Sequence, residues 1–89
     1  MGKSDVKKQF GAAVRFHRDQ LGISQEELAG RAGLHRTYIS DVERGARNVS
    51  LESIYRLATA LEVRLSVLFS RLEEAPNPTP GPVFPPMNV

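Results

Sequence analysis

The sequence contains no cysteine, and this absence excludes disulfides and zinc sites built from thiolates. It also lacks a hydrophobic run long enough for a membrane span or a signal peptide, so we expect a cytoplasmic protein with no membrane partner. Two histidines on different predicted helices, without a glycine-rich phosphate loop or a cluster with metal-ligand spacing, assemble no usual catalytic site. We therefore expect neither an enzyme nor a protein that needs a metal or a cofactor.

Length and charge indicate one small domain with a basic half. Eighty-nine residues support a single domain near the lower size limit for independent stability, so dimerisation would help. The formal net charge is only +2, but residues 1–50 hold nine Lys or Arg against six Asp or Glu, whereas residues 51–89 hold three against four. A basic excess confined to one half is typical of a nucleic-acid-binding surface.

Most of the chain lacks proline, because all six prolines lie between Pro76 and Pro86. We therefore divide the chain into a helical domain, residues 1–74, and a proline-rich tail, residues 75–89, in which no helix continues. The tail is expected to be polyproline-like or disordered. It either has no function of its own or packs on the body or on a partner through Val83, Phe84 and Met87.

Residues 25–44 have the spacing of two crossed helices joined by a sharp turn. Ser24 and Glu27 are typical of a capping box at the start of the first helix. Ala29 stands where the two helices would cross, and a larger side chain there would push them apart. Gly33 can adopt the left-handed conformation that ends a helix. The sequence therefore predicts a helix-turn-helix over residues 24–44.

Apolar periodicity predicts three further helices, so the fold class is all-α with five helices in a compact domain. The first ends at Gly22, the fourth begins after Ser50, and the fifth covers about residues 65–73. The predicted inward positions are Phe10, Val14, His17 and Leu21 on the first, Leu51, Ile54, Leu57, Ala58 and Leu61 on the fourth, and Leu68, Phe69 and Leu72 on the fifth. His17 takes a place where an aliphatic residue is usual, so the core there is expected to be partly open or hydrogen-bonded, with His17 a satisfied core histidine rather than a ligand.

The pattern resembles the lambda-repressor/Cro-like helix-turn-helix family, also called the xenobiotic-response-element type of bacterial regulator. The resemblance covers about residues 8–73 and is carried by Arg15-x-x-Arg18, Ile23-Ser24-Gln25-Glu26-Glu27-Leu28-Ala29, Glu43-Arg44-Gly45, Ser50-Leu51-Glu52 and Leu57-Ala58-x-Ala60-Leu61. Within the family, the runs 36–40 and 45–50 look most like the controller proteins of restriction-modification systems, which are single-domain dimers. The same runs occur in prophage repressors, so that alternative stays open.

The exposed face of the second helix of the pair, residues 35–44, carries the candidate base-reading side chains. Arg36 lies near the helix N-terminus, and its planar guanidinium can donate two hydrogen bonds to guanine O6 and N7. Thr37, Tyr38 and Ser40 are further candidates for contacts with base edges. The alternatives are a phosphate contact for Arg36 and packing against the helix pair for Tyr38. Asp41 would repel phosphate, so it is expected to face solvent or an intramolecular partner.

Four residues around this helix are expected to contact the DNA backbone: Gln25, His35, Arg47 and Asn48. Gln25 lies in the first turn of the preceding helix, where backbone N–H groups favour an anion. The resemblance implies that this glutamine holds a phosphate and supports the recognition helix. His35 could add a phosphate contact when protonated. Arg47 and Asn48 follow the recognition helix in a loop and would position the protein rather than specify the sequence.

The resemblance also implies that Arg18 and Glu43 form a partly buried ion pair between the first helix and the end of the recognition helix. One recognition helix reads too few base pairs to select a genomic site, so we expect a homodimer on a palindromic operator in double-stranded DNA. Apolar residues of the fifth helix and its approach are the candidate dimer interface, and they could instead complete the monomer core. These residues are Val63, Leu65, Val67 and Phe69.

The sequence therefore predicts a dimeric, sequence-specific transcriptional regulator that occupies an operator, with activation through contact with RNA polymerase possible. The operator sequence and the direction of control cannot be read from one chain. An alternative from another class is an interaction adaptor or antitoxin, in which the same fold binds protein and the tail recruits a partner.

Overall fold

A computed structural model describes residues 5–73 of the chain. This part contains five α-helices, one short 3-10 helix and no strand. The helices are α1 (Val6–Leu21), α2 (Gln25–Ala32), α3 (Arg36–Glu43), α4 (Leu51–Leu61) and α5 (Leu65–Ser70), followed by the 3-10 helix η1 (Arg71–Glu73). The predicted all-α class with five helices is confirmed. The tail and its candidate packing residues Val83, Phe84 and Met87 lie outside the described residues.

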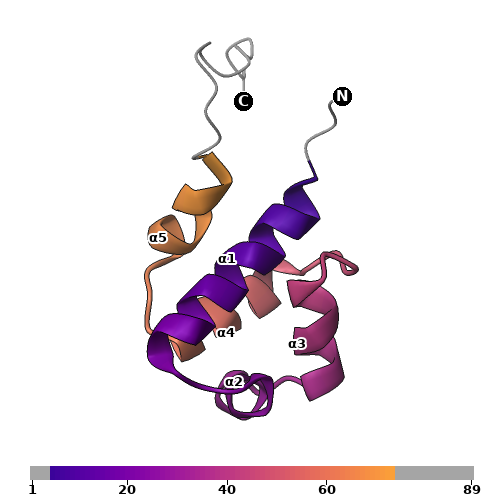
Figure 1. The fold of residues 1–89 in the computed structure, drawn as a ribbon, viewed down its shortest axis with the longest axis vertical. Helices are drawn as coiled ribbons and strands as arrows, with labels where there is room; N and C mark the ends of the chain where they lie inside the picture. Colours follow the sequence, from indigo (N-terminus) through magenta and orange to yellow (C-terminus); the bar gives the residue numbers. More distant parts are fainter. Residues whose placement is uncertain (1–4, 74–89) are drawn as a thin grey trace, which may run out of the picture.

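The helix α1 crosses the middle of the molecule, with α3 on one side, α5 on the other and α4 behind it (Figure 1). The helix α3 packs against α1 and α2, and α2 also packs against α4. This arrangement supports α3 from behind and leaves its outer face open. Within residues 5–73, the longest apolar stretches fall short of what a helix needs to cross a membrane.

The two helices of the predicted helix-turn-helix begin and end where the sequence signals them. The Ser24 hydroxyl accepts a hydrogen bond from the backbone N–H of Glu27 at 3.0 Å, whereas the Glu27 carboxylate accepts from Arg31 at 2.9 Å. Only one half of the capping box is therefore used for capping. Gly33 ends α2 with φ of 70°, a left-handed conformation that glycine adopts without strain. At the start of α3, the His35 side chain makes no capping hydrogen bond.

All five helices contribute to one core of apolar side chains, and no charged or polar residue among residues 5–73 is fully buried. Ala29 is only 4% exposed, as its place at the helix crossing requires. The largest side chains without solvent exposure are Val14, Leu28, Ile39, Val42, Leu57, Leu61 and Leu68.

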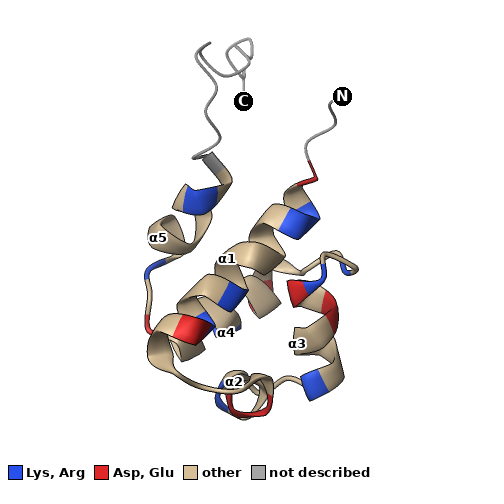
Figure 2. Cartoon of the chain, in the orientation of Figure 1, with Lys and Arg blue, Asp and Glu red and all other residues tan. Residues whose placement is uncertain are grey.

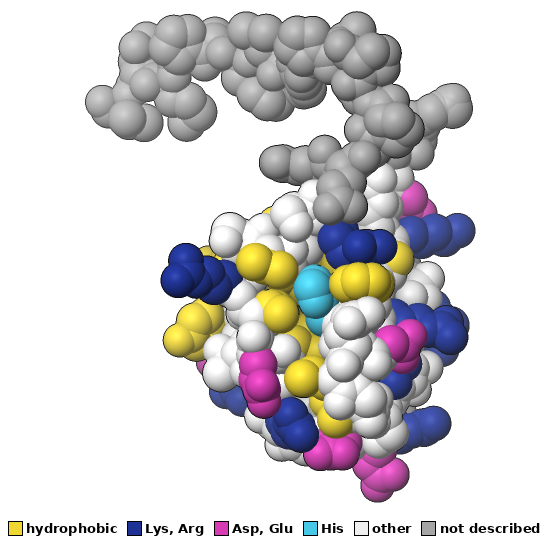
Figure 3. Space-filling model, turned by 60° about the vertical axis from the view of Figure 1, so that its left-hand side comes forward, with side chains coloured by type: hydrophobic (Ala, Val, Ile, Leu, Met, Phe, Trp, Pro, Cys, Tyr) yellow, Lys and Arg dark blue, Asp and Glu magenta, His cyan; other side chains and the backbone are white. Residues whose placement is uncertain are grey.

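One of the predicted inward residues, Leu51, was placed wrongly, and the histidine among them, His17, lies inward only in part. Leu51 continues the apolar stripe of α4, but it stands at the first position of the helix and is 76% exposed. His17 is half-buried, and its Nε2 atom, although hidden from solvent, has no hydrogen-bond partner within residues 5–73. The core is therefore partly open at His17, and the expected hydrogen bond to its Nε2 is not found among residues 5–73. Figure 3 shows a histidine among hydrophobic side chains on the side that carries α5.

Candidate nucleic-acid interface

The outer face of α3 and the loop that follows it bring most of the predicted DNA contacts onto one surface. Arg36 and Thr37 are exposed in the first turn of α3, and Arg36 forms no ion pair with any residue of the described part. Tyr38 and Ser40 are half-buried, and Tyr38 also packs against the core. Figure 2 shows a basic residue at one end of α3 and a mixture of acidic and basic residues at the other.

Behind α3, the carboxylate of Glu43 is the centre of a buried group of hydrogen bonds. Arg18 donates to it from Nε at 2.6 Å and from Nη2 at 3.0 Å, and also donates from Nη1 to the carbonyl oxygen of Ile23 at 2.9 Å. The side chains of Arg18 and Glu43 are 13% and 5% exposed. The hydrogen bond to Glu43 raises the pKa of Arg18, against the opposing effect of burial. The pair joins α1 to the last turn of α3, and Arg18 also binds the turn between α1 and α2.

Gln25 also belongs to this group, because its Nε2 donates to Oε1 of Glu43 at 3.0 Å. One amide hydrogen is therefore used inside the protein, while the second hydrogen and the carbonyl oxygen remain for other partners. The residue stands in the first turn of α2 and is half-buried. Its side chain thus couples the start of α2 to the end of α3.

The helices α1 and α3 approach each other closely at Gly11, a residue that sequence reasoning missed. A Cβ atom at this position would overlap the carbonyl oxygen of Val42 and would lie 2.8 Å from that of Glu43. Gly11 is buried in the middle of α1, where a glycine ordinarily weakens a helix. The small residues Gly11, Ala12 and Ala13 are the signal that could have indicated the contact.

On the outer side of the last turn of α3, the carboxylate of Asp41 accepts hydrogen bonds from two arginines. Arg44 donates from Nη2 to Oδ1 at 2.6 Å, and Arg47 donates from Nη2 to Oδ2 at 3.0 Å. Arg44 also donates to the hydroxyl of Ser40 at 3.0 Å, and the Arg47 guanidinium lies over the ring of Tyr38, 4.7 Å from its centroid. The hydrogen bond from Arg47 is the main cause that lowers the pKa of Asp41. Asp41 is thus an intramolecular partner.

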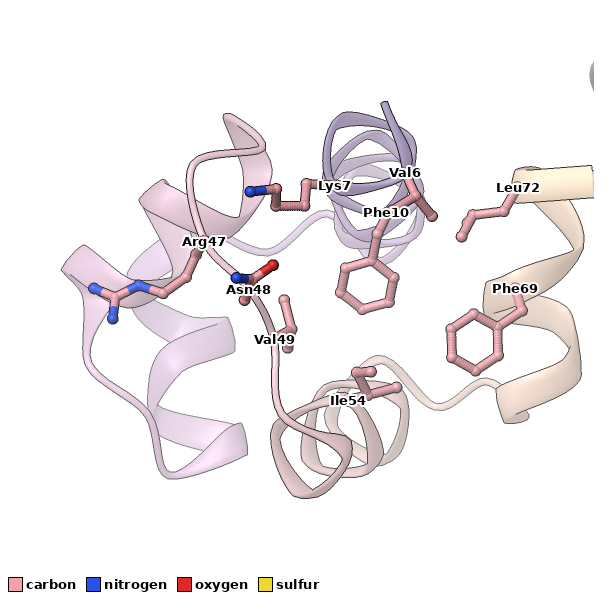
Figure 4. A pocket seen from close by; sticks show the side chains of 9 residues that line it. All are labelled: Val6, Lys7, Phe10, Arg47, Asn48, Val49, Ile54, Phe69 and Leu72. Atoms are coloured by element: carbon pink, nitrogen blue, oxygen red, sulfur yellow. The ribbon is translucent and has the colours of Figure 1, made fainter. Parts of the chain in front are cut away.

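The remaining predicted backbone contacts, His35 and Asn48, are exposed. Asn48 and Arg47 also border an open hollow between α1, α4, α5 and the loop after α3. Figure 4 shows Arg47 pointing away from the apolar side chains that face one another in this hollow. The lining side chains are Val6, Lys7, Phe10, Arg47, Asn48, Val49, Ile54, Phe69 and Leu72.

The four candidate dimer residues differ in exposure. Val67 is 42% exposed, whereas Val63, Leu65 and Phe69 are half-buried and pack against the core. These three residues thus contribute to the monomer core while keeping part of their surface free. On the neighbouring helix α1, Phe16 is 38% exposed.

Comparison with known proteins gives consistent matches. Residues 14–68 match the family model described as helix-turn-helix. Control protein C.BamHI from Bacillus amyloliquefaciens is 48% identical over 62 residues, which are 68% of this chain and 76% of that protein. The crystal structure of the restriction-modification controller protein C.AhdI from Aeromonas hydrophila matches with 49% identity and a TM-score of 0.70, covering 75% of this chain and 100% of that one.

The wild-type restriction-modification controller protein C.Esp1396I matches with 33% identity and a TM-score of 0.74, over 81% of this chain and 92% of that one. Structures of C.Esp1396I in which a single arginine, threonine or tyrosine is replaced by alanine match as well.

Proposed function

Because this chain belongs to the helix-turn-helix family that includes the restriction-modification controller proteins, we propose that it is the controller of such a system. As a member of this family, the chain is a DNA-binding transcription regulator. In the role that we propose, it binds a palindromic operator as a dimer and regulates the neighbouring promoter. The observation that carries the proposal is the exposed first turn of α3 on a helix that the fold supports only from behind.

Base reading is assigned to Arg36, Thr37, Tyr38 and Ser40. Arg36 is free of ion pairs within the described residues, so its guanidinium is available for guanine. Arg36, Thr37 and Tyr38 also have the residue types that were replaced one at a time in C.Esp1396I. The Ser40 hydroxyl accepts a hydrogen bond from Arg44, and its own hydrogen remains available to donate to a base edge.

Contacts with the phosphate backbone are assigned to Gln25, His35, Arg47 and Asn48. Gln25 stands at the N-terminus of α2, where the backbone N–H groups and the helix dipole favour an anion. His35 and Asn48 are exposed, one before α3 and one after it, so they could contact phosphates on either side of the groove. These residues would set the register of α3 on the duplex without reading bases.

We place the dimer interface on the exposed parts of Val63, Leu65, Val67 and Phe69. Val67 supports this assignment because an exposed valine beside partly exposed apolar neighbours gains from being covered. Two copies would then present their α3 helices to successive major grooves. Contact with RNA polymerase is the further step by which such a dimer would activate transcription.

The experiment is selection of bound sequences from random duplex DNA by the full chain and by Arg36→Ala, at one stated salt concentration. We expect a palindromic motif for the wild type and, for Arg36→Ala, loss of information at one position in each half-site, worth about 1–3 kcal/mol. Arg15→Ala is the matched control, because it removes the same charge from an exposed site on α1.

The outcomes separate the alternatives. A motif without symmetry would contradict the dimer, and an unchanged motif for Arg36→Ala would remove Arg36 from base reading. No enrichment by the wild type would favour the protein-interaction adaptor instead.

A further inference from the structure

One carboxylate controls two of the arginines at the candidate interface. The side chain of Asp41 is 21% exposed, and its two oxygens each accept a hydrogen bond from a different arginine, Arg44 and Arg47. The arginine side chains are themselves 63% and 44% exposed. Asp41 therefore lies beneath two cations that face solvent beside the recognition helix.

This arrangement fixes where Arg47 is presented. Arg47 lies in the loop after α3, and three features connect that loop to the helix: the Asp41 carboxylate, the ring of Tyr38 and the hydrogen bond from the Ala46 N–H to the Asp41 carbonyl oxygen at 2.9 Å. A long side chain that is held before binding loses less conformational entropy when it meets its target. The contact with Asp41 thus holds the Arg47 side chain in one conformation before it meets DNA.

The same contact reduces the attraction to any phosphate. Non-specific DNA binding comes from the neutralisation of phosphates by lysine and arginine, and it is independent of sequence. With Asp41 between them, Arg44 and Arg47 present a net charge of one cation rather than two. A phosphate that approaches from an unfavourable position must compete with a carboxylate for either arginine.

We propose that Asp41 is a specificity-determining residue of the DNA interface, which positions Arg47 and withholds positive charge from sequence-independent phosphate contacts. This inference rests on the proposed function. Asp41 acts through the two arginines and is a positioning residue rather than a base-reading one. An aspartate is ionised at neutral pH, as this role requires, and the hydrogen bond from Arg47 lowers the pKa of Asp41 further.

The test compares the full chain with Asp41→Asn, using the duplex obtained by selection and a scrambled duplex of the same length. Asparagine keeps the size and one acceptor oxygen but removes the charge. We expect the affinity for the scrambled duplex to rise, by up to about eightfold at 0.1 M salt if one more phosphate is neutralised, and the salt slope to steepen by about 0.9. Affinity for the selected duplex should rise less, so the ratio of specific to non-specific affinity falls.

Two further variants make the test specific. Glu62→Gln removes one negative charge at the C-cap of α4, where Glu62 pairs with Arg31 at 3.5 Å, and it should leave the affinity ratio within about twofold of the wild type. Asp41→Glu keeps the charge and should keep the salt slope, even if the longer side chain shifts Arg47. Circular dichroism should show the same helix content for all variants.

The inference is overturned if Asp41→Asn has the wild-type salt slope and the wild-type affinity ratio. It is also overturned if Asp41→Asn weakens binding to both duplexes equally, because Asp41 would then be only a structural support. Failure of the wild type to select any sequence would instead contradict the proposed function, so the two failures are distinguishable.

Discussion

Glu43 and Asp41 stand two residues apart in the last turn of α3, and they face opposite sides of the helix. Each carboxylate accepts hydrogen bonds from two side chains, Glu43 from Arg18 and Gln25, and Asp41 from two arginines of its own turn and loop. The Glu43 side chain is 5% exposed, whereas that of Asp41 is 21% exposed. The two carboxylates therefore accept the same kind of hydrogen bond with different consequences. The more buried one stabilises the packing of the helices, whereas the more exposed one lowers the positive charge of a surface.

The prediction with the largest expected effect tests this contrast by removing Arg18, the arginine partner of the buried Glu43 carboxylate. In Arg18→Ala, Glu43 would keep only Gln25 as a side-chain donor among the described residues while remaining shielded from water. Leaving a buried charge without its partner costs about 3 kcal/mol. We expect the free energy of unfolding, measured by urea denaturation at pH 7, to fall by this amount. DNA binding should weaken as a consequence.

Arg15→Ala is the control for the loss of Arg18, because Arg15 is an arginine of the same helix whose ion pair with Asp19 is exposed and 4.0 Å long. Such pairs contribute about 0–1 kcal/mol, so this variant should unfold close to the wild-type midpoint. If both variants lost the same stability, the burial of the Arg18–Glu43 pair would not be what matters.

The second prediction tests the close contact between α1 and the last turn of α3, where Glu43 is buried. Gly11→Ala would bring a methyl group into the backbone carbonyls of Val42 and Glu43, which cannot move aside as a flexible side chain could. Overpacking of this kind costs about 2 kcal/mol, and α1 would have to move away from the last turn of α3. We expect a lower thermal midpoint in a full-chain melt.

Gly30→Ala is the matched control for Gly11→Ala. Gly30 also lies inside a helix, but a Cβ atom there would meet nothing within 4 Å. Replacing a helical glycine by alanine without a clash stabilises by about 0.5–1 kcal/mol. Opposite shifts of the two thermal midpoints are expected, and shifts of the same sign would contradict the close contact.

The sequence predicted those parts of the fold that depend on local signals. Ser24 and Gly33 mark the start and the end of α2, because capping and left-handed backbone are properties of one or two residues. Leu51 was placed wrongly because apolar periodicity assigns a residue to a face of the helix, whereas its burial depends on tertiary packing, and Leu51 is exposed. Gly11 was missed because a run of small residues in a helix indicates a close contact without naming the helix that makes it.

The candidate site was likewise predicted only where local signals or the family resemblance indicated it. The resemblance implied that Arg18 and Glu43 would pair, and the two side chains lie together in the structure. The double role of Asp41 could not be derived, because it depends on the loop folding back so that Arg47 lies over Tyr38. Loop geometry is set by several contacts at once, and the sequence indicated an intramolecular partner for Asp41 without identifying Arg47 as that partner.

His17 extends the comparison to a shielded polar group, because its Nε2 has no hydrogen-bond partner in the described part of the chain. It carries the smallest predicted effect. Burial, and after it the positive charge of Arg71, lower the pKa of His17. The folded state therefore favours the neutral ring, so stability is complete above the unfolded pKa of about 6.5 and falls as the pH drops below it. We expect urea denaturation to show less stability at pH 5.5 than at pH 7.5.

Replacement of the ring separates this effect from the titration of Asp41, whose lowered pKa also makes stability fall at low pH. His17→Leu should lose part of the difference between pH 7.5 and pH 5.5, because leucine cannot be protonated. His35→Gln, which changes the exposed histidine before α3, should keep the wild-type pH dependence. An unchanged pH dependence in His17→Leu would mean that the His17 ring has the same pKa in the folded and the unfolded state. The contrast between buried and exposed groups would then apply to the carboxylates alone.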